Sequence, residues 1–263
     1  MTEITPSQFS NWAGAAGLSR VWVVSRADVD AAFAGTGTAG NSTAGEAPPL
    51  TPADLHPGYR AAVLLASPGR AFWEGFRRAV PELAAGRPDA AGPNPLDRYS
   101  EEVVEALAGR LGKHDPTALT LYPFHHERQL LGFGRLLGGA RWTAATPFGM
   151  TVDPHFGPWF VWRGAILTAL DWPPTPMPET PACEGCPAPC VTACPASAVA
   201  LSGFDWETCA DFRLNASPCR ETCLARIACP VGSQFRYGEE QLRYHYGASL
   251  RMIERWAGRK AEP

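Results

Sequence analysis

Apolar and polar residues alternate along this chain in two patterns, one with the period of strands and one with the period of helices. Short runs rich in β-branched and aromatic residues predict strands. These runs are RVWVVS (20–25), YRAAVLLASP (59–68), ALTLYPF (118–124) and WFVWRGAILTAL (159–170). Apolar residues spaced three and four positions apart predict helices over 6–17, 69–83, 96–112, 126–139 and 238–258. Most of the chain is therefore a region of strands and helices.

Stretches rich in proline and glycine separate these elements. The segments 35–52 and 85–95 combine Gly, Pro and small polar residues, which predicts exposed loops. The segment 171–182 carries five prolines and separates the strand–helix region from a block that contains every cysteine. This linker is a plausible domain boundary.

The composition narrows the classes of function. The chain has 263 residues, 45% of them apolar, which is enough to bury a full core. Its formal net charge is −3 and no run of Lys or Arg exceeds two residues, so we expect no nucleic-acid partner. The first residues lack the basic and apolar regions of a signal peptide, and no apolar run is long enough to span a membrane. We therefore expect a cytoplasmic protein without a membrane partner.

All eight cysteines fall between Cys183 and Cys229. In a reducing compartment such a block is more typical of metal binding than of disulfides. The block contributes four, one and three thiols in turn, which suffices for two four-thiolate sites. The first and last runs both end in Cys-Pro, which is a habit of iron–sulfur proteins.

The spacing predicts how the thiols divide between two clusters. Three close cysteines can surround one corner of a cubane cluster, whereas a remote cysteine followed by proline ligates the other cluster in two-cluster ferredoxins. One [4Fe–4S] cluster is therefore predicted on Cys183, Cys186, Cys190 and Cys229. The second is predicted on Cys194, Cys209, Cys219 and Cys223.

Other interpretations of the cysteines stay open. Thiolates also form structural zinc sites, and disulfides or one cluster with a degenerate second site are further alternatives. The spacing departs from that of bacterial ferredoxins, because three residues separate Cys186 from Cys190 and five precede Cys229. Arg220 and Arg226 lie beside these cysteines, where they either raise the potential of a cluster or face solvent.

The segment PFGMTVDPHFGPWFVWRGAIL (147–167) is similar to a segment of the type C cobalamin-processing, or cyanocobalamin reductase, family. These cytosolic chaperones remove the upper ligand of vitamin B12. The likeness includes Gly149, Pro154, Phe156, Gly157, Trp159, Phe160, Arg163 and Gly164. The resemblance extends upstream to residue 124, through Arg128 and Gln129, and returns over 236–246, through Tyr237, Glu239, Glu240 and Gln241.

The order of the parts resembles the epoxyqueuosine reductase family. There a cobalamin-binding domain precedes cysteines in a four-plus-one-plus-three arrangement that carries two [4Fe–4S] clusters, and both families share a nitroreductase-like α/β fold. The resemblance implies an α/β (α+β) chain with a nitroreductase-like, cobalamin-binding domain over 1–178. A ferredoxin-like two-cluster segment would follow over 179–235, and a C-terminal helix over 236–263 would pack back on the first domain.

One departure from the epoxyqueuosine reductases bears on the chemistry. That family carries a catalytic Asp just before the helix that begins here near His125, and this chain has no carboxylate there until Glu127. Queuosine chemistry, with a tRNA substrate, is therefore the less favoured function.

The resemblance also implies a site for a corrinoid. Aromatic walls would exclude water and the lower base, an arginine would pair with a polar group of the ligand, and glycines would let the backbone approach a flat ring. The structural alternatives are a strand packed in the core, an ion pair and simple turns. The residues concerned are Gly149, Phe156, Gly157, Trp159, Phe160 and Arg163.

Three functions follow from these patterns. The first is an iron–sulfur oxidoreductase that passes electrons from [4Fe–4S] clusters to a bound corrinoid, with an unknown electron donor and no assigned catalytic residue. Its reaction would be cobalamin reduction, cobalamin dealkylation or the corrinoid-dependent reduction of a small substrate. The second is a ferredoxin-type electron-transfer protein without corrinoid chemistry of its own. The third is an interaction module stabilised by zinc.

Overall fold

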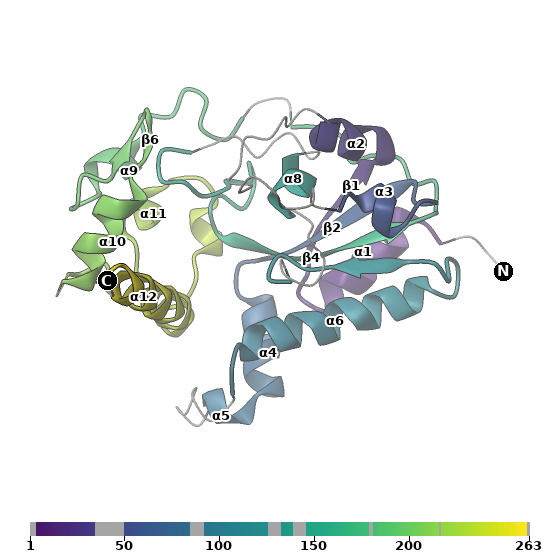
Figure 1. Cartoon of the computed structure of the whole chain (residues 1–263), viewed down its shortest axis with the longest axis horizontal. Coiled ribbons are helices and arrows are strands. Elements are labelled where there is room, and N and C mark those ends of the chain that lie inside the picture. Colours follow the sequence, from purple (N-terminus) through teal and green to yellow (C-terminus); the bar gives the residue numbers. More distant parts are fainter. Residues whose placement is uncertain are drawn as a thin grey trace. The chain divides into compact units, whose positions relative to one another are not determined.

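The computed structural model of the chain describes residues 4–34, 50–84, 92–125, 133–138, 146–178, 181–215 and 217–261 (Figure 1). The chain divides into two compact units. Unit 1 comprises Met1–Trp142 and Val161–Met177, and unit 2 comprises Thr143–Phe160 and Pro178–Pro263. The division into domains at 1–178, 179–235 and 236–263 stays a prediction.

A four-stranded sheet forms the centre of unit 1, in the order β1-β2-β4-β3. The strands are β1 (Arg20–Ser25), β2 (Ala61–Pro68), β3 (Leu119–Leu121) and β4 (Phe160–Thr168). β1 is antiparallel to β2, and β3 is antiparallel to β4. Every residue of β2 is buried, which explains its apolar sequence from Ala61 to Ala66. All four strands lie within the runs predicted from the sequence.

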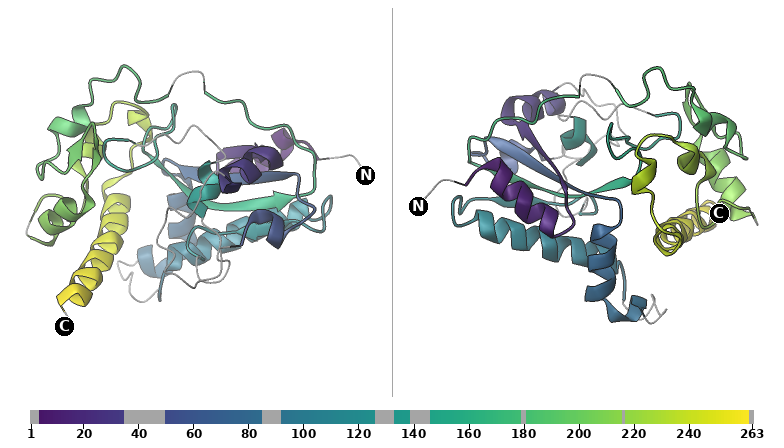
Figure 2. Two further views of the ribbon diagram at one scale, coloured as in Figure 1. Left: turned by 45° about the horizontal axis from the view of Figure 1, so that its top comes forward. Right: turned by 180° about the vertical axis from the view of Figure 1, so that it is seen from behind.

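Helices cover both faces of this sheet. They are α1 (Pro6–Ala15), α2 (Arg26–Ala34), α3 (Pro52–Leu55), α4 (Ala71–Ala79), α5 (Pro81–Ala84), α6 (Pro95–Leu111) and α8 (Phe133–Gly138). α6 runs along one face beside α1 and α4, while α2 contacts α8 on the other face (Figures 1 and 2). The arrangement confirms the predicted mixed α/β architecture.

The differences from the predicted helices have local causes. The helix predicted over 69–83 is divided into α4 and α5, because Pro81 disfavours a helical conformation at the residue before it. The sequence patterns did not predict α2, in which Val29 is the buried residue, so its apolar periodicity is weak. Of the predicted helix 126–139, residues 126–132 and 139 lie outside the described residues. The same holds for most of the predicted loops 35–52 and 85–95.

Unit 2 contains the cysteines on short elements and one long helix. These are α9 (Pro189–Thr192), β5 (Val199–Ala200), β6 (Gly203–Phe204), α10 (Trp206–Leu214), α11 (Leu224–Ala228), the 3-10 helix η2 (Ser233–Phe235) and α12 (Glu239–Ala261). α12 contacts α10 within this unit. In the described ranges, no helix combines the length and the apolar character that a membrane span requires.

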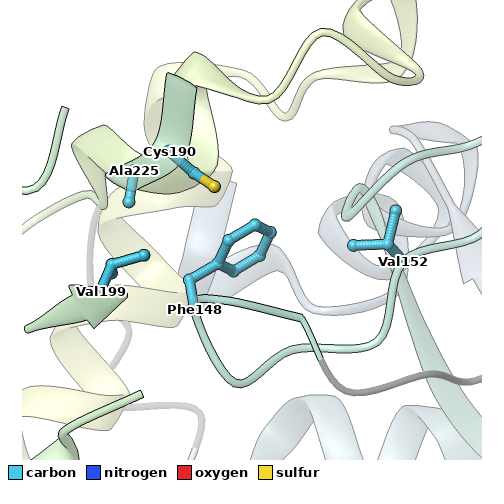
Figure 3. Packing of buried hydrophobic residues seen from close by; sticks show 5 residues of the cluster. All are labelled: Phe148, Val152, Cys190, Val199 and Ala225. Carbon is cyan, nitrogen blue, oxygen red and sulfur yellow. The ribbon is translucent and has the colours of Figure 1, made fainter. Parts of the chain in front are cut away.

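The segment 146–160 is built into the core of unit 2. Phe148 and Val152 from this segment pack with Cys190, Val199 and Ala225, which come from the cysteine block (Figure 3). The ring of Phe148 lies between Val152 on one side and Val199 with Ala225 on the other (Figure 3). The segment expected to contact a corrinoid therefore also contributes to the apolar core of unit 2.

A close backbone approach fixes the end of this segment. Gly157 has a φ of +62°, and a Cβ built there would lie 1.9 Å from the carbonyl oxygen of Val231. A Cβ at Gly232, with a φ of +65°, would lie 2.2 Å from the backbone of Phe156. Both positions therefore require glycine. A side chain there would strain the backbone at a positive φ and would overlap with the backbone of the other segment.

A buried carboxylate ties the turn after α6 to the end of β4 in unit 1. Oδ1 of Asp115 accepts hydrogen bonds from the N–H and the Oγ1 of Thr117, at 3.0 and 2.5 Å. Oδ2 accepts from the Oγ1 of Thr168 at 2.6 Å and the N–H of Ala169 at 2.7 Å. Burial opposes ionisation of Asp115, but the four hydrogen bonds outweigh it and lower the pKa of this carboxyl.

We predict that Asp115→Asn lowers the free energy of unfolding by about 1–3 kcal/mol at neutral pH, since it weakens buried hydrogen bonds to a charged acceptor. The folded-state pKa is lowered, so the stabilisation is present above the pKa of the unfolded state and is lost as the pH falls through the folded value. Denaturant unfolding at several pH values should show the gap between wild type and variant closing in acid. Asp171→Asn, which removes an exposed partner of Arg60, is the control and should change little. A gap that does not depend on pH would contradict the assignment.

Candidate metal centre

The cysteines were predicted from the sequence to form two sets of four, and the structure bears on each set separately. The first set is Cys183, Cys186, Cys190 and Cys229. Burial raises the pKa of Cys229, and the thiols of the other three members raise it further. Partial burial, followed by the thiols of Cys186 and Cys190, also raises the pKa of Cys183. The remote Cys229 therefore joins the close triplet.

The second set is Cys194, Cys209, Cys219 and Cys223. Burial raises the pKa of Cys209 to about 11, and the other three thiols contribute. Burial, together with the thiols of Cys223 and Cys194, raises the pKa of Cys219. Burial is the largest cause of the raised pKa of Cys190, and the thiol of Cys223 contributes to it as well. This contribution indicates that the two sets are neighbours.

Helix α11 connects one cysteine of each set. Cys223 is its N-cap residue, and the Sγ accepts a hydrogen bond from the N–H of Arg226 at 3.4 Å. Cys229 is its C-cap residue. The interval before Cys229, which departs from the ferredoxin spacing, is therefore one short helix of five residues.

All four cysteines of the second set line one cavity in unit 2, with a volume of about 230 Å³. Much of the remaining lining is apolar, with contributions from Phe148, Gly149, Met150, Val199, Phe204 and Leu224. Apolar walls limit the access of water to whatever the thiols hold, and exposure to solvent is one of the factors that set the potential of a cluster. The chemistry of the donor set and the surrounding cavity both fit an iron–sulfur cluster.

Arg213 of α10 also lines this cavity, and it is buried. It lies one helical turn after Cys209, so the two residues share a face of α10. Burial raises the pKa of Cys209 and Cys219, and the positive charge of Arg213 opposes this rise. The sequence analysis missed Arg213. The spacing of four from Cys209 was a usable signal, but only with 206–214 assigned as a helix.

Arg226 is also buried, with 3% of its surface exposed. One Nη donates to the carbonyl oxygen of Pro158 at 2.6 Å. The guanidinium lies 4.6 Å from the ring centre of Trp159 and 4.7 Å from that of Tyr237. The solvent-facing alternative for this arginine is therefore wrong. Arg220, by contrast, is partly exposed and forms an ion pair with Glu254 at 3.5 Å.

The residues expected to contact a corrinoid have internal contacts in unit 2. Trp159 is fully buried against Tyr237, and Phe160 is buried as well. The ring of Phe156 packs on that of Phe235 at 4.7 Å. Gly149, with a φ of +68°, closely approaches the ring of Phe204. The corrinoid role of these residues stays a prediction, while Phe156, Trp159 and Gly149 have packing roles within unit 2.

Arg163, the sixth expected corrinoid residue, belongs to unit 1. Its Nε donates to the Oγ of Ser67 at 2.8 Å, and its guanidinium lies 5.1 Å from the ring centre of Phe72. Burial raises the pKa of Asp97, and the nearby charge of Arg163 partly opposes this. Arg163 thus lies in a polar cluster at the start of α6.

The same cluster contains His125, whose Nε2 pairs closely with Glu101 of α6. The charges of Glu101 and His125 act on Asp97 in opposite directions, Glu101 raising its pKa and His125 lowering it. The sequence analysis did not expect carboxylates beside His125. Arg128 and Gln129, which carried part of the resemblance, and Glu127 lie outside the described residues.

None of the eight cysteines is paired in a disulfide, and all eight are in the described part of the chain. Within those same ranges, no group of three or more His, Cys, Asp or Glu side chains has the geometry of a ready site for a single metal ion. The assignment of the cysteines as metal ligands therefore stays a prediction, based on the composition of the two sets and on the cavity.

The fold is similar to solved structures from the two families noted above. For CblC, a B12-trafficking protein of C. elegans and homologue of human MMACHC, the TM-score is 0.53 at 14% identity, covering 94% of this chain and 94% of that chain. For an epoxyqueuosine reductase solved with a modified tRNA-Tyr stem loop, the TM-score is 0.51 at 12% identity, covering 90% and 68%. For the epoxyqueuosine reductase of Bacillus subtilis, the TM-score is 0.50 at 13% identity, covering 89% and 66%.

The chain thus spans about two thirds of the length of these epoxyqueuosine reductases. No protein-family model matches the chain, and no curated protein matches it. At these identities the likeness shows the fold, and it confirms the resemblance of the fold to both families.

We predict that the two sets load metal independently. Cys209→Ser should remove the metal of the second set alone, and Cys186→Ser that of the first set alone, because each set has its own four thiols. With two [4Fe–4S] clusters, iron per chain should fall from about eight to about four in either variant. Anaerobic analysis of iron and sulfide checks this, with Ser202→Ala, at an exposed position between β5 and β6, as the control. Complete loss of iron in both variants would contradict two separate sites.

Proposed function

We propose that the chain is an iron–sulfur oxidoreductase that passes electrons from two [4Fe–4S] clusters to a bound corrinoid. The observation that carries the proposal is the single cavity lined by all four cysteines of the second set, to which the first set adds four further thiols. Eight thiols in two such sets match the ligand requirement of two cubane clusters. Such clusters, when bound, supply single electrons.

The residues of unit 2 support this role in distinct ways. The first set would hold one cluster and the second set the other, inside the cavity described above. α11 would keep the clusters adjacent, because its two caps belong to different sets. Phe148 and Val199 would keep water from the thiols, and Arg213 would offset their negative charge.

The corrinoid part of the proposal is supported by the fold. The chain covers nearly the whole of CblC, which is described as a B12-trafficking protein, and CblC covers nearly the whole of the chain. A protein favours reduction of a corrinoid when it binds the form without axial ligands more tightly than the starting form, which packed apolar groups promote by excluding water. Arg163 in unit 1 would orient a polar side group of the corrinoid through charge-assisted hydrogen bonds.

A second candidate is an electron-transfer protein that uses the same clusters without a corrinoid. One observation favours it: Trp159, expected to form a wall of the corrinoid site, is fully buried against Tyr237 and Arg226 of its own unit. Both candidates predict clusters that reduce reversibly. They differ in whether the chain binds cobalamin.

We predict that anaerobic protein with intact clusters binds cob(II)alamin and shifts its visible spectrum to the base-off form. Arg163→Gln should weaken binding by about 10- to 100-fold, the effect of losing a hydrogen bond from a charged donor. The control is Arg60→Gln, which removes an exposed ion pair with Asp171 and should leave affinity within about twofold. The measurement is a spectroscopic titration before and after reduction with dithionite. Clusters that bleach while cobalamin stays unbound would leave the electron-transfer protein as the function.

A further inference from the structure

Arg213 occupies an unusual position for a charged side chain. It lines the cavity of the second set, and 6% of its surface is exposed. Its Nε donates to the carbonyl oxygen of Cys219 at 2.9 Å, which is one of the cysteines of that set. Its Nη1 donates to the Oγ of Ser249 and its Nη2 to the carbonyl oxygen of Tyr246, both at 2.9 Å. The guanidinium is therefore held by its own helix α10, by the cysteine loop and by α12.

The acceptors around Arg213 are all neutral oxygens. Its Nη2 also approaches the carbonyl oxygen of Arg220 at 3.5 Å, and its guanidinium lies 5.3 Å from the ring centre of Tyr246. No carboxylate pairs with Arg213 among the described residues. Burying an unneutralised charge is costly, so its retention indicates that a negative group nearby compensates for it. Four thiolates around a cluster are such a group.

We propose that Arg213 is a positioning residue that raises the reduction potential of the cluster held by Cys194, Cys209, Cys219 and Cys223. This inference rests on the proposed function, because it requires a cluster in that set. The reduction concerned adds one electron from an external low-potential donor, forms and breaks no bond, and transfers no proton. A fixed positive charge beside the site stabilises the reduced, more negative state over the oxidised one.

The effect should be confined to one of the two clusters. Arg213 lines the cavity of the second set and bonds to the backbone of Cys219. No hydrogen bond joins its side chain to a member of the first set within the described chain. Two midpoint potentials are therefore expected in the wild type, and removal of Arg213 should move one of them.

The first experiment compares Arg213→Gln with Arg213→Lys in potentiometric titrations followed by electron paramagnetic resonance. Arg213→Gln should make one midpoint potential more negative by about 59 mV, a tenfold change in the equilibrium constant of a one-electron couple. Arg213→Lys keeps the positive charge, so the equilibrium constant for reduction should stay within about twofold of the wild-type value. If Arg213 only held the three segments together through its hydrogen bonds, Arg213→Lys would change the midpoint potential as much as Arg213→Gln, and the proposal would be wrong.

Arg243→Gln is the matched control for the removal of a positive charge from unit 2. Arg243 lies on α12, is more than half exposed, and pairs with Glu221 and Glu239. Its loss should leave both midpoint potentials unchanged, since exposed and paired charges are screened by solvent. A shift in this control equal to that of Arg213→Gln would overturn the proposal, because net charge alone would then explain it.

A second pair of variants tests the charge without removing Arg213. Ser249 accepts a hydrogen bond from the guanidinium, so Ser249→Asp places a carboxylate where it neutralises that charge. The same potential should become more negative, by up to about tenfold in the equilibrium constant, whereas the uncharged Ser249→Asn should leave it unchanged. Equal behaviour of the two variants would overturn the proposal even where Arg213→Gln fails to fold.

The outcomes separate this inference from the function on which it depends. If the protein binds no iron after anaerobic reconstitution, the proposed function is wrong, and this inference is wrong with it. Protein with two clusters whose potentials are the same in Arg213→Gln and wild type would overturn the inference alone. Partial loading does not blur the comparison, because a midpoint potential does not depend on the fraction of chains that carry iron.

Discussion

Unit 2 depends on how the thiols of Cys194, Cys209, Cys219 and Cys223 are kept around one cavity. Thiolates repel one another, and burial disfavours their charged form further, so they need a positive charge or a bound metal to stay close. Phe148 and its neighbours bury part of the cysteine block, and the buried Arg213 supplies a positive charge beside Cys209 and Cys219. α11 then sets the spacing between the sets, because it begins at Cys223 and ends at Cys229. The long C-terminal helix α12 contributes by accepting the side chain of Arg213 at Tyr246 and Ser249.

The segment 146–160 belongs to unit 2 because its apolar residues pack against the cysteine block. Phe148 and Val152 fill the core below Cys190, and Gly157 fits against the backbone of Val231 only because it lacks a side chain. This segment leads directly into β4 of the sheet in unit 1. A chain that carries both a corrinoid and clusters would thus use one continuous segment for the support of both.

The sequence predicted the strands of the sheet better than it predicted the surroundings of the cysteines, whose division into two ligand sets stays a prediction. Strands such as 20–25 were evident because buried strands are rich in β-branched residues. The role of Arg213 was not evident, because it depends on contacts with Tyr246 and Ser249, which are far from it in the chain. The contact of Trp159 with Tyr237 could not be predicted either. An apolar residue beside a strand gives the same sequence pattern whether it lines a ligand site or packs in the core.

Mössbauer spectroscopy of protein loaded anaerobically with enriched iron and zinc, with the iron and zinc per chain determined on the same sample, tests the central claim most directly. The account predicts that the bound iron is all in cubane clusters, at about two clusters per chain. Zinc in place of iron, or iron in a single cluster that needs cysteines from both sets, would contradict it.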